Sequence, residues 1–198
     1  TDLENSFHLH IMPNMGSQDG NEIMKYAKKG DIGSTDIQFI INGAVKEAGL
    51  LVLLNNYIKK KTGAFPFGEK FNVRNAPKSI KELTKLCQER ITKSEMPLLV
   101  GVGDTVTSNK SNDKEQWLRG GSDRGFLTLI QELGKAYSKN NQVIFVNSCN
   151  KEVYRPSASY QSMEGITDRE DPLKITCIIQ GGPKEYTEWF ETLANARS

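Results

Sequence analysis

The run Pro97-Leu98-Leu99-Val100-Gly101-Val102-Gly103-Asp104 decides the fold of this 198-residue chain. Its first six residues are Pro97 to Val102, and apolar side chains follow one another there without polar alternation. A short run of this kind is typical of a strand buried on both faces of a parallel sheet. A helical pattern from Gly125 and a second apolar run at Gln142 to Asn147 follow. This strand–helix–strand order predicts a right-handed βαβ unit, and therefore an α/β fold with an open parallel sheet.

Further elements are predicted on both sides of this unit. Alternating apolar residues predict strands over 35–41 and 174–179. Apolar residues at helical spacing predict helices over 19–29, 46–63 and 79–91, and from Pro183 onward. The polar stretches 104–124 and 150–172 are expected to be loops.

Composition and charge exclude several classes of partner. With 26 basic against 24 acidic residues, the net charge is +2, and no clustered basic face of the kind that binds nucleic acid is visible. No apolar run approaches the roughly 18 residues that cross a bilayer. Three dispersed cysteines without CxxC spacing indicate free thiols of a reducing cytoplasm. We therefore expect a cytoplasmic protein without nucleic-acid or membrane partners.

Asp104 is the first candidate for chemistry. It follows Gly101-Val102-Gly103 at the carboxyl end of a predicted strand, the edge of an open α/β sheet at which ligands bind. Mg²⁺ prefers oxygen ligands, usually one or two carboxylates completed by water and phosphate. Aspartate also caps turns, and taken alone this Gly-Asp pattern favours the turn-capping role.

Asp123 is the second candidate. It stands in Arg119-Gly120-Gly121-Ser122-Asp123-Arg124, just before the predicted helix, where an N-cap role is equally open. Strand end and helix start adjoin in a βαβ unit, so both aspartates are expected to face one cation. The predicted loop between them is unusually long, which favours a functional role.

Lys46 is the third candidate, because it opens a helix at the end where a cation is unfavourable to the helix dipole. Most lysines in this position point into solvent. Beside a phosphate, a lysine would offset the negative charge of the transferring group. The sequence pattern leaves both roles open.

Three motifs carry a resemblance to a known family: Asn42-Gly43-Ala44-Val45-Lys46-Glu47-Ala48-Gly49, Gly101-Val102-Gly103-Asp104-Thr105-Val106-Thr107-Ser108, and Arg119-Gly120-Gly121-Ser122-Asp123-Arg124. The resemblance extends over nearly the whole chain, through two further stretches: Phe65-Pro66-Phe67-Gly68-Glu69 and Asp168-Arg169-Glu170-Asp171-Pro172-Leu173-Lys174-Ile175. The chain resembles the glucosylglycerol 3-phosphate phosphatases, salt-tolerance enzymes of the haloacid-dehalogenase superfamily. More distantly, it is similar to the trehalose- and sucrose-phosphate phosphatases.

The resemblance implies a Rossmann-like core with a cap, a sugar-phosphate substrate, Mg²⁺ and an aspartyl-phosphate intermediate. Lys46 falls on the superfamily's phosphate-neutralising lysine, and Asp104 falls on its late metal carboxylate. Asp123 is the candidate for the second acid of that motif, displaced by an insertion. Residues 1–41 would be the end of the cap domain, and residues 42–198 the C-terminal part of the phosphatase core.

One departure from the superfamily pattern stands out. The superfamily carries its nucleophile and general acid in an early Asp-x-Asp motif, and this motif is absent from all 198 residues. We therefore expect a missing N-terminal half of the same protein to supply it, and the chain alone to be inactive. Two alternatives remain open: a phosphatase for another sugar or disaccharide phosphate, and a non-catalytic pseudo-phosphatase module.

Overall fold

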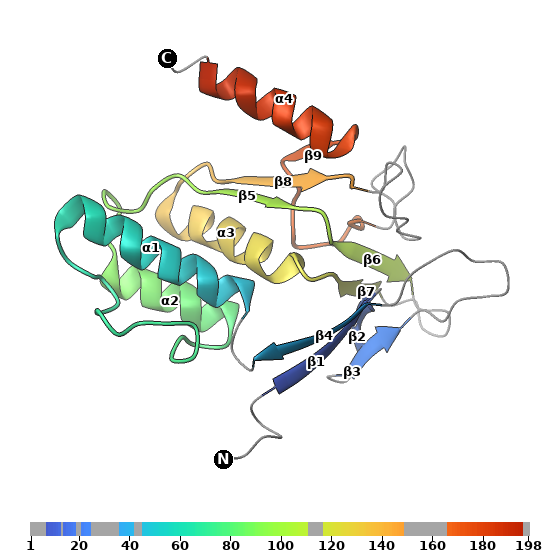
Figure 1. Ribbon diagram of the computed structural model, residues 1–198, viewed down its shortest axis with the longest axis horizontal. Helices are drawn as coiled ribbons and strands as arrows, with labels where there is room; N and C mark the ends of the chain where they lie inside the picture. Colours follow the sequence, from blue (N-terminus) through green and yellow to red (C-terminus); the bar gives the residue numbers. More distant parts are fainter. Residues whose placement is uncertain are drawn as a thin grey trace, which may run out of the picture. The chain divides into compact units, whose positions relative to one another are not determined.

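The computed structural model of the chain describes residues 7–12, 14–18, 21–24, 36–41, 45–110, 117–148 and 166–195. In chain order, the elements are β1 (Phe7–Met12), β2 (Asn14–Gln18), β3 (Asn21–Met24), β4 (Asp36–Ile41), α1 (Lys46–Thr62), α2 (Ile80–Arg90), β5 (Val100–Gly103), β6 (Thr107–Lys110), β7 (Trp117–Gly120), α3 (Arg124–Tyr137), β8 (Gln142–Val146), β9 (Cys177–Ile179) and α4 (Gly182–Asn195) (Figure 1).

The sheet that carries the candidate site has the strand order β5-β8-β9. Strands β8 and β9 run parallel, with Ile144 opposite Cys177 and Val146 opposite Ile179. The predicted α/β fold with a parallel sheet is therefore confirmed. The boundary between a cap and a core at residues 41 and 42 stays a prediction.

The chain divides into two compact units, each built from separate stretches of sequence. The first comprises Thr1–His10, Ile37–Gly101 and Gly125–Gln142, and the second comprises Ile11–Asp36, Val102–Arg124 and Val143–Ser198. Helices α1, α2 and α3 thus belong almost entirely to the first unit. The candidate aspartates belong to the second.

In the first unit, local signals in the sequence explain where the helices begin and end. Helix α2 starts with a capping box, in which the Ser79 side chain and Glu82 bind each other's backbone N–H groups. Helix α1 ends at Gly63, whose φ of 87° suits a residue without a Cβ atom. The buried faces of α1, α2 and α3 supply apolar side chains, among them Leu51, Leu83, Leu127 and Leu133. Their burial is the main stabilising contribution to this unit.

Asn141 fastens the start of the β5 segment to α3 within the same unit. Its side-chain oxygen accepts the Leu99 N–H at 3.0 Å, and its side-chain nitrogen donates to the Ile130 carbonyl at 2.9 Å. Both hydrogen bonds are buried, so the polar side chain has the partners that burial requires.

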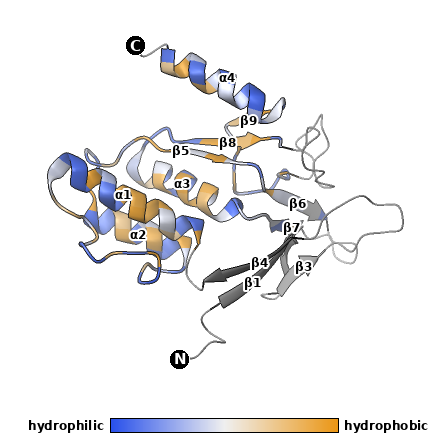
Figure 2. Cartoon of the chain, viewed as in Figure 1, coloured by the Kyte–Doolittle hydropathy of each residue, from blue (hydrophilic) through white to orange (hydrophobic). Residues whose placement is uncertain are grey.

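In the second unit, an apolar cluster lies along β8 and β9. Ile144, Val146 and Ile179 are buried, and Val102, Cys177, Tyr186 and Trp189 pack against them. The tyrosine and the tryptophan belong to α4. Their rings are stacked at an interplanar angle of 24°, with centroids 6.3 Å apart. Figure 2 shows the apolar residues concentrated on β8 and a mixture of apolar and polar residues on α4.

Four sequence predictions need correction. The helix expected over 19–29 is wrong at its start, because Asn21–Met24 forms strand β3, paired with β2 in an antiparallel arrangement. Gln18 pairs with Asn21, and the sequence between them, Asp-Gly, is a strong hairpin signal. That signal outweighs the three apolar residues at helical spacing.

The stretch 104–124 is not a simple loop, because it contains the antiparallel strands β6 and β7. The strand expected over 174–179 begins only at Cys177. Just before the strand, at Thr176, the Val143 N–H donates to the threonine hydroxyl at 2.8 Å. A side-chain oxygen thus takes the place of the backbone carbonyl that would accept this N–H in a regular strand pair.

Burial of β5 on both faces is also wrong. Leu98 and Val100 remain 53% and 48% exposed, whereas Gly101 and Gly103 are buried. Only the face of β5 that carries Gly101 packs against α3, where an added Cβ atom would meet Ile130 and Leu127, and Val100 points to the opposite face.

Candidate active site

The site is built around the turn that follows β5, where Asp104 and Asp123 come together. One oxygen of the Asp123 carboxylate, Oδ2, accepts the backbone N–H groups of both Asp104 and Thr105 at 2.9 Å. The Asp104 carboxylate accepts the Thr105 hydroxyl at 2.6 Å. Asp123 is buried and Asp104 half-buried. The Asp123 side chain and the Asp104 backbone are therefore in contact, although the two residues lie 19 positions apart in the sequence.

Gly103 allows this approach. A Cβ atom added to Gly103 would lie only 2.8 Å from the Cβ of Asp123 and 3.0 Å from its Oδ2. Any side chain here would push the Asp123 carboxylate away from the two N–H groups that it binds. The glycine before Asp104 is thus required by packing.

Gly121 allows a second close contact, between two backbones. Its φ of 102° lies in the left-handed region, and an added Cβ atom would overlap the Thr105 carbonyl oxygen. The same carbonyl accepts the Asp123 N–H at 3.1 Å. The turn after β5 and the turn before α3 are therefore joined by backbone and side-chain hydrogen bonds together.

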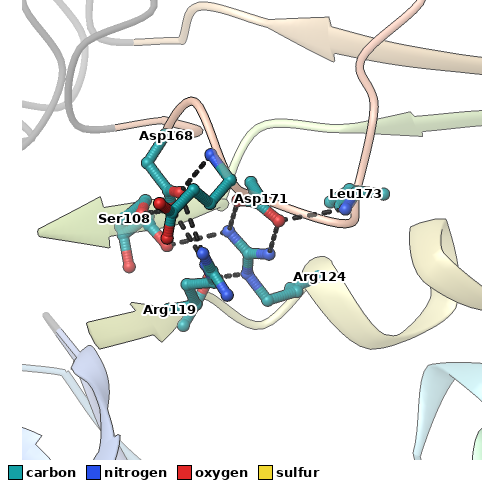
Figure 3. Close-up of polar contacts among 9 residues, drawn as sticks. Ser108, Arg119, Arg124, Asp168, Asp171 and Leu173 are labelled. Atoms are coloured by element: carbon teal, nitrogen blue, oxygen red, sulfur yellow. Dashed lines mark hydrogen bonds and ion pairs between the residues drawn. The ribbon is translucent and has the colours of Figure 1, made fainter. Parts of the chain in front are cut away.

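A carboxylate from a distant part of the sequence binds the β6–β7 hairpin. Ser108 and Arg119 stand opposite each other in the hairpin, and both donate to Asp168 Oδ2. Arg119 also donates to Asp168 Oδ1 at 2.9 Å, which completes a bidentate ion pair (Figure 3). The Asp168 side chain has no exposed surface. Chiefly through the hydrogen bonds from Arg119, the pKa of Asp168 falls well below its usual range.

A second bidentate pair lies next to the first. Arg124 donates to both carboxylate oxygens of Asp171, at 2.9 and 2.8 Å, and Asp171 also accepts the Leu173 N–H at 3.0 Å. The Asp171 side chain is 1% exposed and that of Arg124 15%. Figure 3 shows the two arginines pointing from the end of β7 and the start of α3 toward the 168–173 turn.

Sequence reasoning did not identify Ser108, Arg119, Arg124, Asp168 or Asp171 as part of the site. No local pattern links side chains 47 or more residues apart. The one available signal is the presence of two arginines at 119–124 and two aspartates at 168–171, which carry opposite charge.

Lys46 lies in the first unit, as the first residue of α1. It is exposed, and its Nζ lies 5.9 Å from the centroid of the Phe126 ring. Next to it, the Glu47 carboxylate approaches Gly125 so closely that a Cβ atom there would overlap Oε1. The start of α1 and the start of α3 are thus neighbours within this unit.

The donors at the Asp104–Asp123 turn fit a hard divalent cation. Both side chains offer carboxylate oxygens, and the neighbouring Thr105 adds a hydroxyl. Across the described ranges, no group of three His, Cys, Asp or Glu residues has the geometry for a metal site. Two carboxylates completed by water and a substrate phosphate are the usual arrangement for Mg²⁺, which seldom occupies an all-protein cage. This turn is therefore suited to Mg²⁺ in the presence of a phosphate ester.

Comparison with known proteins gives two matches. A family model described as glucosylglycerol-phosphate phosphatase matches residues 1–194. A curated glucosylglycerol-phosphate phosphatase from Synechocystis sp. is 43% identical over 207 residues, which cover 98% of this chain and 49% of the relative. The chain thus spans about half the length of that relative. No solved structure matches the chain. Of the described residues, none belongs to a helix with the length and apolar character that a bilayer span requires.

Proposed function

Because this chain belongs to the glucosylglycerol-phosphate phosphatase family, we propose that the full-length protein hydrolyses glucosylglycerol 3-phosphate to glucosylglycerol and phosphate. The observation that carries the proposal is the joining of Asp104 and Asp123 at the end of β5. The reaction would serve the synthesis of a compatible solute in the cytoplasm.

In this proposal, Asp104 and Asp123 hold Mg²⁺. The cation supplies positive charge that stabilises the transferring phosphoryl group. Asp123 has a second task, because its Oδ2 fixes the backbone at Asp104 and Thr105. Lys46 contributes a further positive charge toward the phosphate.

The nucleophile would come from an upstream half of the protein. A carboxylate there would attack phosphorus, the bond from phosphorus to the glycerol oxygen would break, and that oxygen would take a proton from a general acid. Water would then hydrolyse the aspartyl phosphate to phosphate and the free carboxylate. Two observations support an upstream source. The chain contains no Asp-x-Asp, and Asp168 and Asp171 are each held by an arginine in a bidentate pair. A carboxylate held in this way is poorly placed to attack phosphorus.

The experiment is a phosphate-release assay on the purified full-length protein. With Mg²⁺ present, glucosylglycerol 3-phosphate should be hydrolysed with a higher kcat/KM than trehalose phosphate or sucrose phosphate, and residues 1–198 alone should release no phosphate. A higher kcat/KM for trehalose phosphate or sucrose phosphate would instead identify that disaccharide phosphate as the substrate. No hydrolysis of any ester by the full-length protein would indicate a binding module.

A further inference from the structure

We propose that Arg124 is a positioning residue for the metal site and that its ion pair with Asp171 holds Asp104 and Asp123 in their ligating arrangement. The inference rests on the proposed function, since it assigns Arg124 a task at the same Mg²⁺ site. Arg124 follows Asp123 directly in the sequence. Any displacement of its backbone therefore moves the carboxylate that fixes Asp104.

The guanidinium of Arg124 closes the base of the β6–β7 hairpin. Nη2 donates to the Thr107 carbonyl at 3.0 Å, and Nε donates to the Gly120 carbonyl at 3.1 Å. Thr107 and Gly120 are paired residues of the two strands. They lie three residues after Asp104 and three before Asp123, so the guanidinium binds both chain segments that lead to the aspartates.

Asp171 keeps the guanidinium in this orientation. It binds Nη1 and Nη2 through separate oxygens, and its own position is fixed by the Leu173 N–H. The planar fork of arginine matches a carboxylate and two carbonyls at once, whereas a lysine ammonium cannot reach all of them. Loss of one partner alone leaves a charge buried without its counterion, which is strongly destabilising.

The neighbouring pair provides a matched control. Arg119 also binds its carboxylate partner, Asp168, through two nitrogens, Nε and Nη2, and Ser108 shares that carboxylate. This pair joins the hairpin to the 168–173 turn beyond Thr107 and Gly120 (Figure 3). A change at Arg119 should therefore affect stability more than metal binding.

The test measures Mg²⁺ binding to the full-length protein by calorimetry without substrate, together with the Mg²⁺ concentration for half-maximal activity. For Arg124→Lys we expect the Mg²⁺ dissociation constant and the half-maximal Mg²⁺ concentration each to rise about 10-fold or more, the range found for groups that orient metal ligands. For Arg119→Lys we expect the Mg²⁺ dissociation constant and the half-maximal Mg²⁺ concentration to stay within about 2-fold of their wild-type values, because the ion pair of Arg119 lies outside the turn that carries the proposed ligands.

A double variant separates metal binding from folding. Arg124→Met with Asp171→Leu removes both buried charges together, and it should melt at a higher temperature than Arg124→Met alone. Its Mg²⁺ affinity should stay as low as in the single variant. Wild-type Mg²⁺ affinity in Arg124→Lys or in the double variant would overturn the inference, as would an equal loss in Arg119→Lys. Wild-type protein that binds Mg²⁺ but hydrolyses no ester would overturn the proposed function alone.

Discussion

The Asp123 carboxylate accepts the backbone N–H of Asp104 at 2.9 Å, through the same oxygen that binds the N–H of Thr105. One candidate ligand therefore positions the other. The interaction is short-range in space but spans 19 residues of sequence, including a complete β-hairpin. The structural role of the Asp123 carboxylate is thus observed, and the metal-binding role is proposed for the same side chain.

Two substitutions at Asp123 should separate these roles. Asp123→Asn keeps an oxygen that can accept both N–H groups but removes the negative charge, so Mg²⁺ affinity should fall with little loss of thermal stability. Asp123→Ala also leaves two backbone donors without this acceptor, and we expect a further loss of about 2 kcal/mol or more. Calorimetric Mg²⁺ titration and thermal melting of both full-length variants are the measurements. If Asp123→Asn lowers only the melting temperature, Asp123 is structural and not a ligand.

Substitution of Gly121 should disturb the site through sterics. In Gly121→Ala, the new methyl group would meet the Thr105 carbonyl, and the positive φ adds strain. Gly63→Ala is the matched control, since its φ of 87° is similar but nothing lies within 4 Å of the added Cβ. Both variants should lose about 1 kcal/mol from the positive φ, and Gly121→Ala at least 1–3 kcal/mol more from overpacking. Equal denaturant midpoints for the two variants would contradict the close approach of the two turns.

Lys46 tests whether the start of α1 contributes charge to catalysis. In the full-length protein, Lys46→Ala should lower kcat by about 100-fold or more, as expected for removal of a preorganised electrostatic group. Lys46→Arg should restore little, because a guanidinium does not reproduce the position of an ammonium. Stability should change by no more than about 1 kcal/mol, since the interaction with Phe126 is an exposed cation–π contact. Lys60→Ala, at the far end of the same helix, is the control. An unchanged kcat in Lys46→Ala would make Lys46 an ordinary surface lysine.

Asp168 should make stability depend on acid pH. Its folded-state pKa is lowered by Arg119, so the stabilisation is complete above the unfolded-state pKa of about 4 and is lost progressively as pH falls below it. At pH 7, Asp168→Asn should cost about 3 kcal/mol, because Arg119 loses a buried counterion. The difference in melting temperature between wild type and variant should narrow as pH drops below about 4.

The matched control is Glu170→Gln, an exposed carboxylate on the same turn whose backbone N–H binds Asp168. Its melting temperature should equal that of wild type over the whole pH range. A difference between Asp168→Asn and wild type that stays constant down to strongly acid pH would contradict the ion pair.

Most helices and the parallel strands could be predicted from sequence because their signals are local. The Ser79–Glu82 capping box and the glycine at 63 mark helix ends within a few residues, and the apolar run at Gln142–Val146 is a buried strand. The hairpin inside residues 104–124 could not be predicted in this way. Its strands Thr107–Lys110 and Trp117–Gly120 have only four residues each and show no apolar alternation, and the ion pair between Arg119 and Asp168 contributes to their position.

In the candidate site, too, the features with local sequence signals could be predicted and those that depend on long-range contacts could not. Asp104 and Asp123 were predictable from the rule that strand ends and helix starts adjoin in a βαβ unit. The hydrogen bonds that the Asp123 carboxylate accepts from the backbone, and the ion pairs of Arg119 and Arg124, depend on contacts between segments distant in the sequence. Such contacts leave no periodicity or short motif to detect.

The most direct test of the central claim is the Mg²⁺ dependence of phosphate release by full-length Asp104→Asn, compared with wild type and with Glu69→Gln, an exposed carboxylate in the first unit. Asparagine keeps the shape of the side chain but removes its charge, so the variant should melt like wild type. We predict that it releases phosphate from glucosylglycerol 3-phosphate only at far higher Mg²⁺ concentration, or not at all, while Glu69→Gln behaves as wild type. A folded Asp104→Asn protein with the wild-type Mg²⁺ dependence would contradict the assignment of a metal site to the end of β5.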